Sequence, residues 1–312
     1  MPPNIGYLLP TREQIIAGRH DAASLLALAQ RAEALGYHSV WVGDSVLARP
    51  RHDPLTLLAA VAARVPRVVL GTAVLLPALR NPVLLAQQVA TLDQVAEGRL
   101  ILGVGIARDV PNIRAEFAAC GVPFEQRVGR MMEGLGLCRA LWRGEPVDWH
   151  GRWPVRGGVL APVPHRPGGP PIWIGGNTPA SLRRVGERFD GWFPNAPDSA
   201  TFASQLTELQ AIARSAGRDP AGISAAMYLS LSIDQDAARA GARMDAFLEG
   251  YYGTPAEVLR RRQAVYSGPA EGAADWLAGY AKAGATDLIL RFAGDHARHL
   301  EMLAKILGAL AR

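Results

Sequence analysis

The strongest candidate for ligand binding in this 312-residue sequence is a glycine-rich turn in its second half. Gly175 and Gly176 follow a short apolar segment, and Asn177, Thr178 and Pro179 lead into a helical pattern. Glycine lets backbone amides approach a ligand closely, threonine is a favoured helix N-cap, and proline suits the first helical position. Amides at a helix N-terminus favour a phosphate group. The pattern therefore predicts a phosphate site at this turn, and a tight turn without a ligand is the alternative.

A second candidate is the polar pair Asp44 and Ser45, which follows another apolar segment. Asp44 could accept hydrogen bonds from a ligand or from loop amides, or it could cap its own turn. No histidine or aspartate stands beside Ser45 in a nucleophile pattern, which argues against a serine hydrolase. Arg49, Arg51 and His52 come next. They indicate either a pocket for an anionic or planar substrate or a solvated loop.

The remaining titratable residues give no metal-binding or redox pattern. The seven histidines form no HxH or HxxE motif, and His296 and His299 share a helix face without a third ligand. We therefore predict no metal site. Cys120 and Cys138 are too far apart for a metal or redox motif, and two thiols in a chain of this length suggest a reducing compartment.

Composition excludes several classes of protein. Apolar residues make up 49% of the chain and charged residues 20%, which is typical of a folded enzyme. The formal charge is +5, but the arginines are scattered, so we expect no nucleic-acid partner. No apolar run approaches the ~18 residues of a membrane span, and the N-terminus lacks a signal-peptide pattern. A cytoplasmic protein without a membrane partner is the expectation.

These candidate residues need a framework, and residues 68–105 show its repeating unit. An apolar, β-branched run is followed by an amphipathic helix that Gly98 closes, and then by a second apolar run. Strands that are apolar throughout are typical of a parallel sheet buried on both faces, so this stretch predicts a βαβ unit.

The same unit recurs along the chain and predicts an α/β fold. We expect eight strands, near residues 5, 40, 70, 102, 173, 192, 228 and 289, each followed by helix. An open nucleotide-binding sheet would need a glycine-rich turn after its first strand, where this sequence has Leu9, Pro10 and Thr11. The pattern therefore favours a (β/α)8 TIM barrel, as one domain over residues 1–312. The Gly/Pro-rich residues 143–170 form an insertion loop after the fourth strand. In a barrel the candidate residues all follow strand carboxyl ends, where active sites lie.

Several segments resemble the luciferase-like flavin-dependent oxidoreductase superfamily, which includes luciferase-like monooxygenases and coenzyme F420-dependent oxidoreductases. The matching segments are SVWVGDS, the run from DPLTLLAAV to LILGVG, GVPFEQRVGRMMEGLGLCRALWRGEP, PIWIGGNTPASLRRVGERFDGWFP and GATDLILRF. They occur in order and cover most of the chain.

The resemblance implies a cofactor at the barrel mouth. The family's phosphate site falls on the turn found above, Gly175, Gly176, Asn177 and Thr178. Its third strand often ends in a bulge with a non-proline cis peptide that supports the flavin ring, which here would be Ala73-Val74. Asp44 matches a family position, and Arg108 could hold a flavin phosphate or an anionic substrate.

The catalytic residue stays unassigned, because the family often has histidine where this chain has Ser45. The candidates are Asp44, Ser45 and His52, of which His52 could replace the missing histidine from the same loop.

The resemblance implies a monooxygenase that oxidises a small organic substrate with reduced FMN and O2, with a flavin reductase as the expected source of the reduced FMN. The alternatives are an F420-dependent dehydrogenase or reductase that transfers hydride at C5, and a non-catalytic flavin-binding barrel. A barrel aldolase or hydrolase is disfavoured because the only lysines, Lys282 and Lys305, lie away from strand ends. The family also leads us to expect a homodimer.

Overall fold

The computed structural model describes residues 2–310. The chain divides into two compact units, which we call the terminal unit (residues 2–41 and 173–310) and the middle unit (residues 42–172). Each is described by itself. No helix within residues 2–310 combines the length and apolar character needed to cross a membrane.

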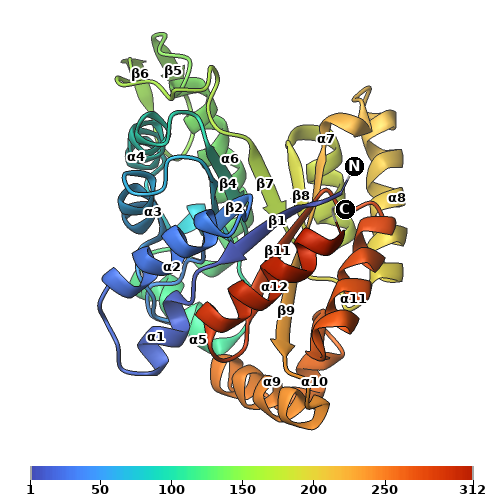
Figure 1. Ribbon diagram of the computed structural model, residues 1–312. Coiled ribbons are helices and arrows are strands. Elements are labelled where there is room, and N and C mark those ends of the chain that lie inside the picture. Colours follow the sequence, from blue (N-terminus) through green and yellow to red (C-terminus); the bar gives the residue numbers. More distant parts are fainter. Residues whose placement is uncertain (1, 311–312) are drawn as a thin grey trace. The chain divides into compact units, whose positions relative to one another are not determined.

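The terminal unit contains both ends of the chain and most of the strands (Figure 1). Its strands are β1 (Asn4–Leu8), β2 (Ser39–Val42), β7 (Ile172–Gly175), β8 (Gly191–Phe193), β9 (Ser224–Ile233), β10 (Val265–Gly268) and β11 (Asp287–Phe292), of which β2 and β7 reach the unit boundary. Its helices are α1 (Thr11–Ile16), α2 (Ala23–Ala34), α7 (Pro179–Arg188), α8 (Ser199–Ser215), η3 (Pro220–Gly222), α9 (Ala237–Tyr252), α10 (Ala256–Arg260), α11 (Ala270–Lys282) and α12 (His296–Leu310).

The middle unit contains the next two strands and the insertion. Its elements are α3 (Pro54–Ala62), β3 (Val69–Thr72), η1 (Pro77–Leu79), α4 (Pro82–Val95), β4 (Leu100–Val104), α5 (Pro111–Ala119), η2 (Phe124–Gln126), α6 (Arg127–Leu141), β5 (Val147–Trp149) and β6 (Val155–Gly158). Strands β3 and β4 pair in parallel, with Leu70 opposite Leu100.

The strand order is β10-β9-β11-β1-β2-β3-β4-β7-β8, and β8 also pairs with β9. Eight parallel strands therefore close into a ring, with β10 added on the outer side of β9. This is the TIM-barrel fold of the α/β class, as the sequence predicted. All eight expected strands are present. Strands β2 and β11 are buried at every residue, which explains why their sequences are largely apolar, although β11 also buries Asp287 and Arg291.

Helix starts follow the capping residues in the sequence. The predicted cap Thr178 accepts a hydrogen bond from Ser181 N at the start of α7, and Pro179 takes the first helical position. Asp53 and Asn81 cap α3 and α4 in the same way, each before a proline. These local signals fix where each helix begins after its strand.

One short helix and three short strands were missed. Helix α1 has only six residues between Pro10 and Gly18, and β10 has four, so neither shows a full hydrophobic period. The insertion is not structureless, because β5 and β6 form an antiparallel hairpin in which Asp148 accepts a hydrogen bond from Gly157 N. This hairpin is largely exposed, so burial leaves no clear pattern in its sequence.

Candidate cofactor site

The turn after β7 in the terminal unit has the backbone shape that its sequence predicted. Gly176 adopts φ +119°, a conformation that side chains disfavour, and a Cβ there would lie 2.9 Å from Ser181 Oγ. Thr178 Oγ1 lies 3.0 Å from the same Ser181 Oγ. The turn thus leads directly into the N-terminus of α7, where the first backbone amides lack helical partners.

Neighbouring side chains hold this turn through its carbonyl groups. Trp192 Nε1 donates to Gly176 O at 2.9 Å, and Gln205 Nε2 donates to Asn177 O at 3.2 Å. Trp192 is fully buried and stacks on Phe202, so this side chain packs within the protein. Because the carbonyls are held from these sides, the peptide planes of the turn have a fixed orientation.

Two amide oxygens near this turn are buried without a hydrogen-bond partner. They are Gln205 Oε1 and Asn195 Oδ1, and Asn195 follows the carboxyl end of β8. An unpaired buried acceptor costs free energy unless a donor reaches it. Sequence analysis did not single out Gln205, because its place on α8 gives no sign that it contacts a loop 28 residues earlier.

In the middle unit, the peptide bond between Ala73 and Val74 is cis, at the place that the family resemblance indicated. Backbone hydrogen bonds fix this segment on both sides. Ala73 N donates to Val42 O at 2.8 Å, Leu75 N donates to Gly103 O at 2.8 Å, and Gly105 N donates to Leu75 O at 2.9 Å. The segment is therefore joined to the end of β2 and to the end of β4.

A glycine allows the chain to pass close to this cis peptide. A Cβ at Gly105 would lie 2.7 Å from Val74 Cγ2. Only glycine therefore fits at the end of β4 without moving Val74. The glycine at position 105 thus has a packing explanation.

Asp44 is held in an ion pair. Its Oδ2 accepts from Arg80 Nη1 at 2.5 Å and from Leu76 N at 2.9 Å, and its Oδ1 accepts from Arg80 Nη2 at 3.2 Å. Burial opposes the charge of Arg80, but the carboxylates of Asp44 and Asp53 outweigh it and raise the pKa of Arg80. Of the roles considered for Asp44, the structure supports the ordering of a neighbouring loop.

The Ser45 hydroxyl group also both donates and accepts a hydrogen bond. Its Oγ donates to Glu116 Oε1 at 2.7 Å and accepts from Arg49 N at 2.9 Å. The single hydroxyl proton thus points to a carboxylate inside the protein. Glu116 was missed by sequence reasoning, although it stands beside Ile113 and Phe117 on the buried face of α5, where a charged residue is unusual.

The other predicted residues of the middle unit lie in loops. His52 is half-buried just before α3, and Arg108 is exposed after β4. Arg108 follows Ala107, which has a left-handed φ of +63°. Such a conformation is uncommon for alanine and directs the chain sharply away from the strand. Within the described residues, no group of three or more His, Cys, Asp or Glu side chains is arranged to hold a metal ion.

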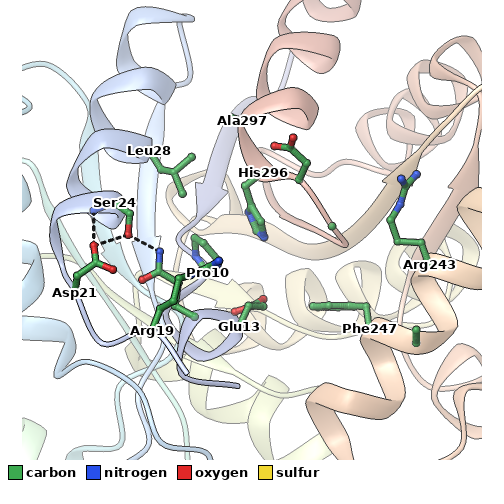
Figure 2. A pocket seen from close by; sticks show the side chains of 14 residues that line it. Pro10, Glu13, Arg19, Asp21, Ser24, Leu28, Arg243, Phe247, His296 and Ala297 are labelled. Atoms are coloured by element: carbon green, nitrogen blue, oxygen red, sulfur yellow. Dashed lines mark hydrogen bonds between the residues drawn. The ribbon is translucent and has the colours of Figure 1, made fainter. Parts of the chain in front are cut away.

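The terminal unit also contains a pocket of about 770 Å³ at the ends of β1 and β11, shown in Figure 2. Its lining includes Pro10, Leu28, Phe247 and His296. His296 Nδ1 lies 2.8 Å from Tyr7 Oη, and burial, followed by the charge of His299, lowers the pKa of His296 to about 3. This imidazole is therefore neutral at ordinary pH.

Comparison with known protein sequences places this arrangement in a family. The profile of the luciferase-like monooxygenase family matches residues 3–307. The chain is 34% identical over 236 residues to a 5,10-methylenetetrahydromethanopterin reductase of Methanolobus tindarius, a match that covers 75% of this chain and 69% of the relative. It is 32% identical over 221 residues to an F420-dependent glucose-6-phosphate dehydrogenase of Mycolicibacterium fortuitum, covering 68% and 65%. The chain thus spans about two thirds of the length of these relatives.

Solved structures share the fold over the whole chain. The monooxygenase RslO1 from Streptomyces bottropensis superposes with a TM-score of 0.85 at 24% identity, covering 100% of both chains. The coenzyme F420-dependent tetrahydromethanopterin reductase from Methanopyrus kandleri gives 0.77 at 21% identity, with the same coverage. At these identities the likeness establishes the fold alone. Because the family profile covers nearly the whole chain and the relatives above 30% identity are named as reductases and dehydrogenases, the chain is an oxidoreductase of the luciferase-like monooxygenase family.

Proposed function

We propose that this protein is an oxidoreductase that uses coenzyme F420 to transfer hydride to or from a small organic substrate. The observation that carries the proposal is the set of relatives at 31–36% identity whose names specify F420. The sequence alone had favoured FMN over F420. The names of these relatives favour F420 over FMN.

The turn after β7, in the terminal unit, fits a phosphate group, and the segment after β3, in the middle unit, fits the support of a flat ring. We assign the phosphate to the turn Gly175, Gly176, Asn177 and Thr178, since Gly176 has the backbone freedom for a close approach and α7 starts directly afterwards.

We assign the support of the ring to Ala73 and Val74. The Val74 side chain lies against Gly105, where a Cβ would come within 2.7 Å of Val74 Cγ2. When bound, F420 supplies the carbon that carries the hydride. The protein's part is to orient the ring and to exclude water. Arg108, exposed after β4, is available to an anionic group of the cofactor or substrate.

The polar residues after β2 take separate roles in this proposal. Asp44 and Ser45 hold loops through Arg80 and Glu116, so neither is our choice for moving a proton to the substrate. His52 stays the candidate for that role, because it lies on the same loop and histidine is the side chain that most often serves as a general acid or base.

An FMN-dependent monooxygenase is the second candidate. The match to the luciferase-like monooxygenase profile over residues 3–307 favours it. In that case a flavin reductase would supply reduced FMN. Dimer formation also stays a prediction, and sedimentation analysis of the purified chain tests it.

Titration of the purified protein with F420 and FMN, each oxidised and reduced, tests the proposal. We expect F420 to bind in the low micromolar range or tighter, and at least ~10-fold more tightly than FMN, a preference of about 1.4 kcal/mol. Thr178→Ala should weaken binding of the preferred cofactor. Thr207→Ala, a change at an exposed threonine on α8, should leave it unchanged. Tighter binding of FMN favours the second candidate, and binding of neither cofactor refutes both.

Catalysis is tested separately, by following the reoxidation of bound reduced cofactor while candidate carbonyl and imine substrates are added. Substrate-dependent reoxidation without O2 supports hydride transfer. Reoxidation that requires O2 supports the monooxygenase. Tight binding without any substrate-dependent reoxidation would indicate the non-catalytic barrel.

A further inference from the structure

The carboxylate of Glu116 makes an unusual set of contacts in the middle unit. The side chain belongs to α5 and only 1% of the residue is exposed. Its Oε1 accepts from Ser45 Oγ at 2.7 Å and from the backbone amides of Val46 at 2.6 Å, Leu47 at 2.8 Å and Ala48 at 3.2 Å. Four donors thus converge on one oxygen, an arrangement that needs the full negative charge of a carboxylate.

A contribution to folding stability does not by itself explain the contacts of the Glu116 carboxylate. Glu116 Oε2 is buried without a hydrogen-bond partner, and burying a carboxylate that is only half satisfied costs free energy. What the contact does achieve is to fix three successive amides of the loop after β2. Val46 and Leu47 themselves are exposed, so apolar packing does not hold this loop.

The fixed loop continues into Arg51. Ser45 Oγ accepts from Arg49 N, and Arg51 Nε donates to Arg49 O at 3.1 Å. The Arg51 guanidinium then lies back over Gly43 at the end of β2. A Cβ on Gly43 would lie 2.3 Å from Arg51 Nη1 and 3.3 Å from the carbonyl oxygen of Ala73. The cation therefore lies beside the cis peptide segment.

We propose that Glu116 is a positioning residue: it fixes the loop after β2 and so holds the Arg51 guanidinium beside the Ala73-Val74 segment, where it binds an anionic group of the cofactor. The last part rests on the proposed function, in which that segment supports the cofactor ring. F420 and FMN are both anions, so a fixed cation beside the segment that supports the ring favours the binding of either cofactor.

The loop part is tested on the unliganded protein by hydrogen exchange. In Glu116→Ala, the amides of Val46, Leu47 and Ala48 should exchange at least about 10-fold faster, because their acceptor is gone. Glu116→Gln retains a neutral acceptor and should show a smaller effect. The control is Glu125→Gln, which removes an exposed carboxylate paired with Arg114 and should leave these amides unchanged. Unchanged exchange in both Glu116 variants overturns the inference.

The Arg51 part is tested by a double-mutant cycle on F420 binding. Glu116→Ala and Arg51→Gln should each raise the dissociation constant for F420. The double variant should have a dissociation constant no higher than that of the weaker-binding single variant, because both changes act through one guanidinium. Glu116→Gln should bind F420 more tightly than Glu116→Ala does. Independent effects that multiply, or an Arg51→Gln variant that binds normally, overturn the positioning role.

Failure of the proposed function gives a different result. If the wild-type protein binds neither F420 nor FMN, the cofactor assignment falls. The exchange rates of the loop amides still decide whether Glu116 fixes the loop.

Discussion

Removing Arg80 should expose how strongly the loop after β3 depends on a buried ion pair. Asp44 and Arg80 form two hydrogen bonds, and their side chains are 3% and 16% exposed. In Arg80→Met the aliphatic stem is retained, but the carboxylate of Asp44 keeps only the amide of Leu76 as a donor. An uncompensated buried charge of this kind costs about 3–5 kcal/mol.

The second partner of Arg80 contributes little to this value. Asp53 accepts from Arg80 Nη2 at 3.1 Å, but its side chain is 49% exposed, and exposed pairs are typically worth less than about 1 kcal/mol. We therefore expect Arg80→Met to lower the free energy of unfolding by about 4 kcal/mol. With an unfolding entropy of roughly 2.1 cal/mol/K per residue, cooperative unfolding of the 312-residue chain gives a Tm decrease of about 6 °C.

Urea denaturation followed by circular dichroism measures this change, and two further variants make the test strict. Arg114→Met removes an arginine whose partners, Asp109 and Glu125, are exposed, and should cost less than about 1 kcal/mol. Combining Arg80→Met with Asp44→Asn should cost less than the two separate effects added together, because the buried charge is then also gone. A loss below about 1 kcal/mol for Arg80→Met, or strict additivity, would refute the reasoning.

Three further predictions concern the terminal unit and the glycine beside the cis peptide. His296 has a pKa of about 3 in the folded chain and ~6.5 in the unfolded chain, so the stabilisation from its neutral form is fully present above about pH 6.5. As the pH falls to 5, this contribution to the free energy of unfolding decreases by up to about 2 kcal/mol. His296→Gln should flatten the pH dependence of stability in that range. Thr178→Ala should cost about 1 kcal/mol in urea denaturation through loss of the α7 cap. Gly105→Ala should cost about 1–3 kcal/mol because its Cβ meets Val74, whereas Gly241→Ala, with open space around it on α9, should be neutral or stabilising; equal effects at the two glycines would contradict this.

Local sequence patterns predicted the eight barrel strands and the turn at Gly176 with its cap at Thr178. The eight barrel strands were predicted because strands buried on both faces have largely apolar sequences, as in β2 and β4. The turn at Gly176 and the cap at Thr178 were predicted because their chemistry acts within a few residues. Short elements such as α1 and β10 escaped, since six or four residues do not show a period.

What the residues after β2 do was decided only by tertiary structure. Asp44 and Ser45 are adjacent and polar, and sequence analysis could treat them only as catalytic or binding candidates. Folding brings Arg80, 36 positions away, to Asp44, and Glu116, 71 positions away, to Ser45. The sequence by itself determined the eight barrel strands, the cap at Thr178 and the family. The tertiary structure decided which polar groups satisfy one another, because hydrogen bonds and buried charges depend on distances across the fold and not on spacing along the chain.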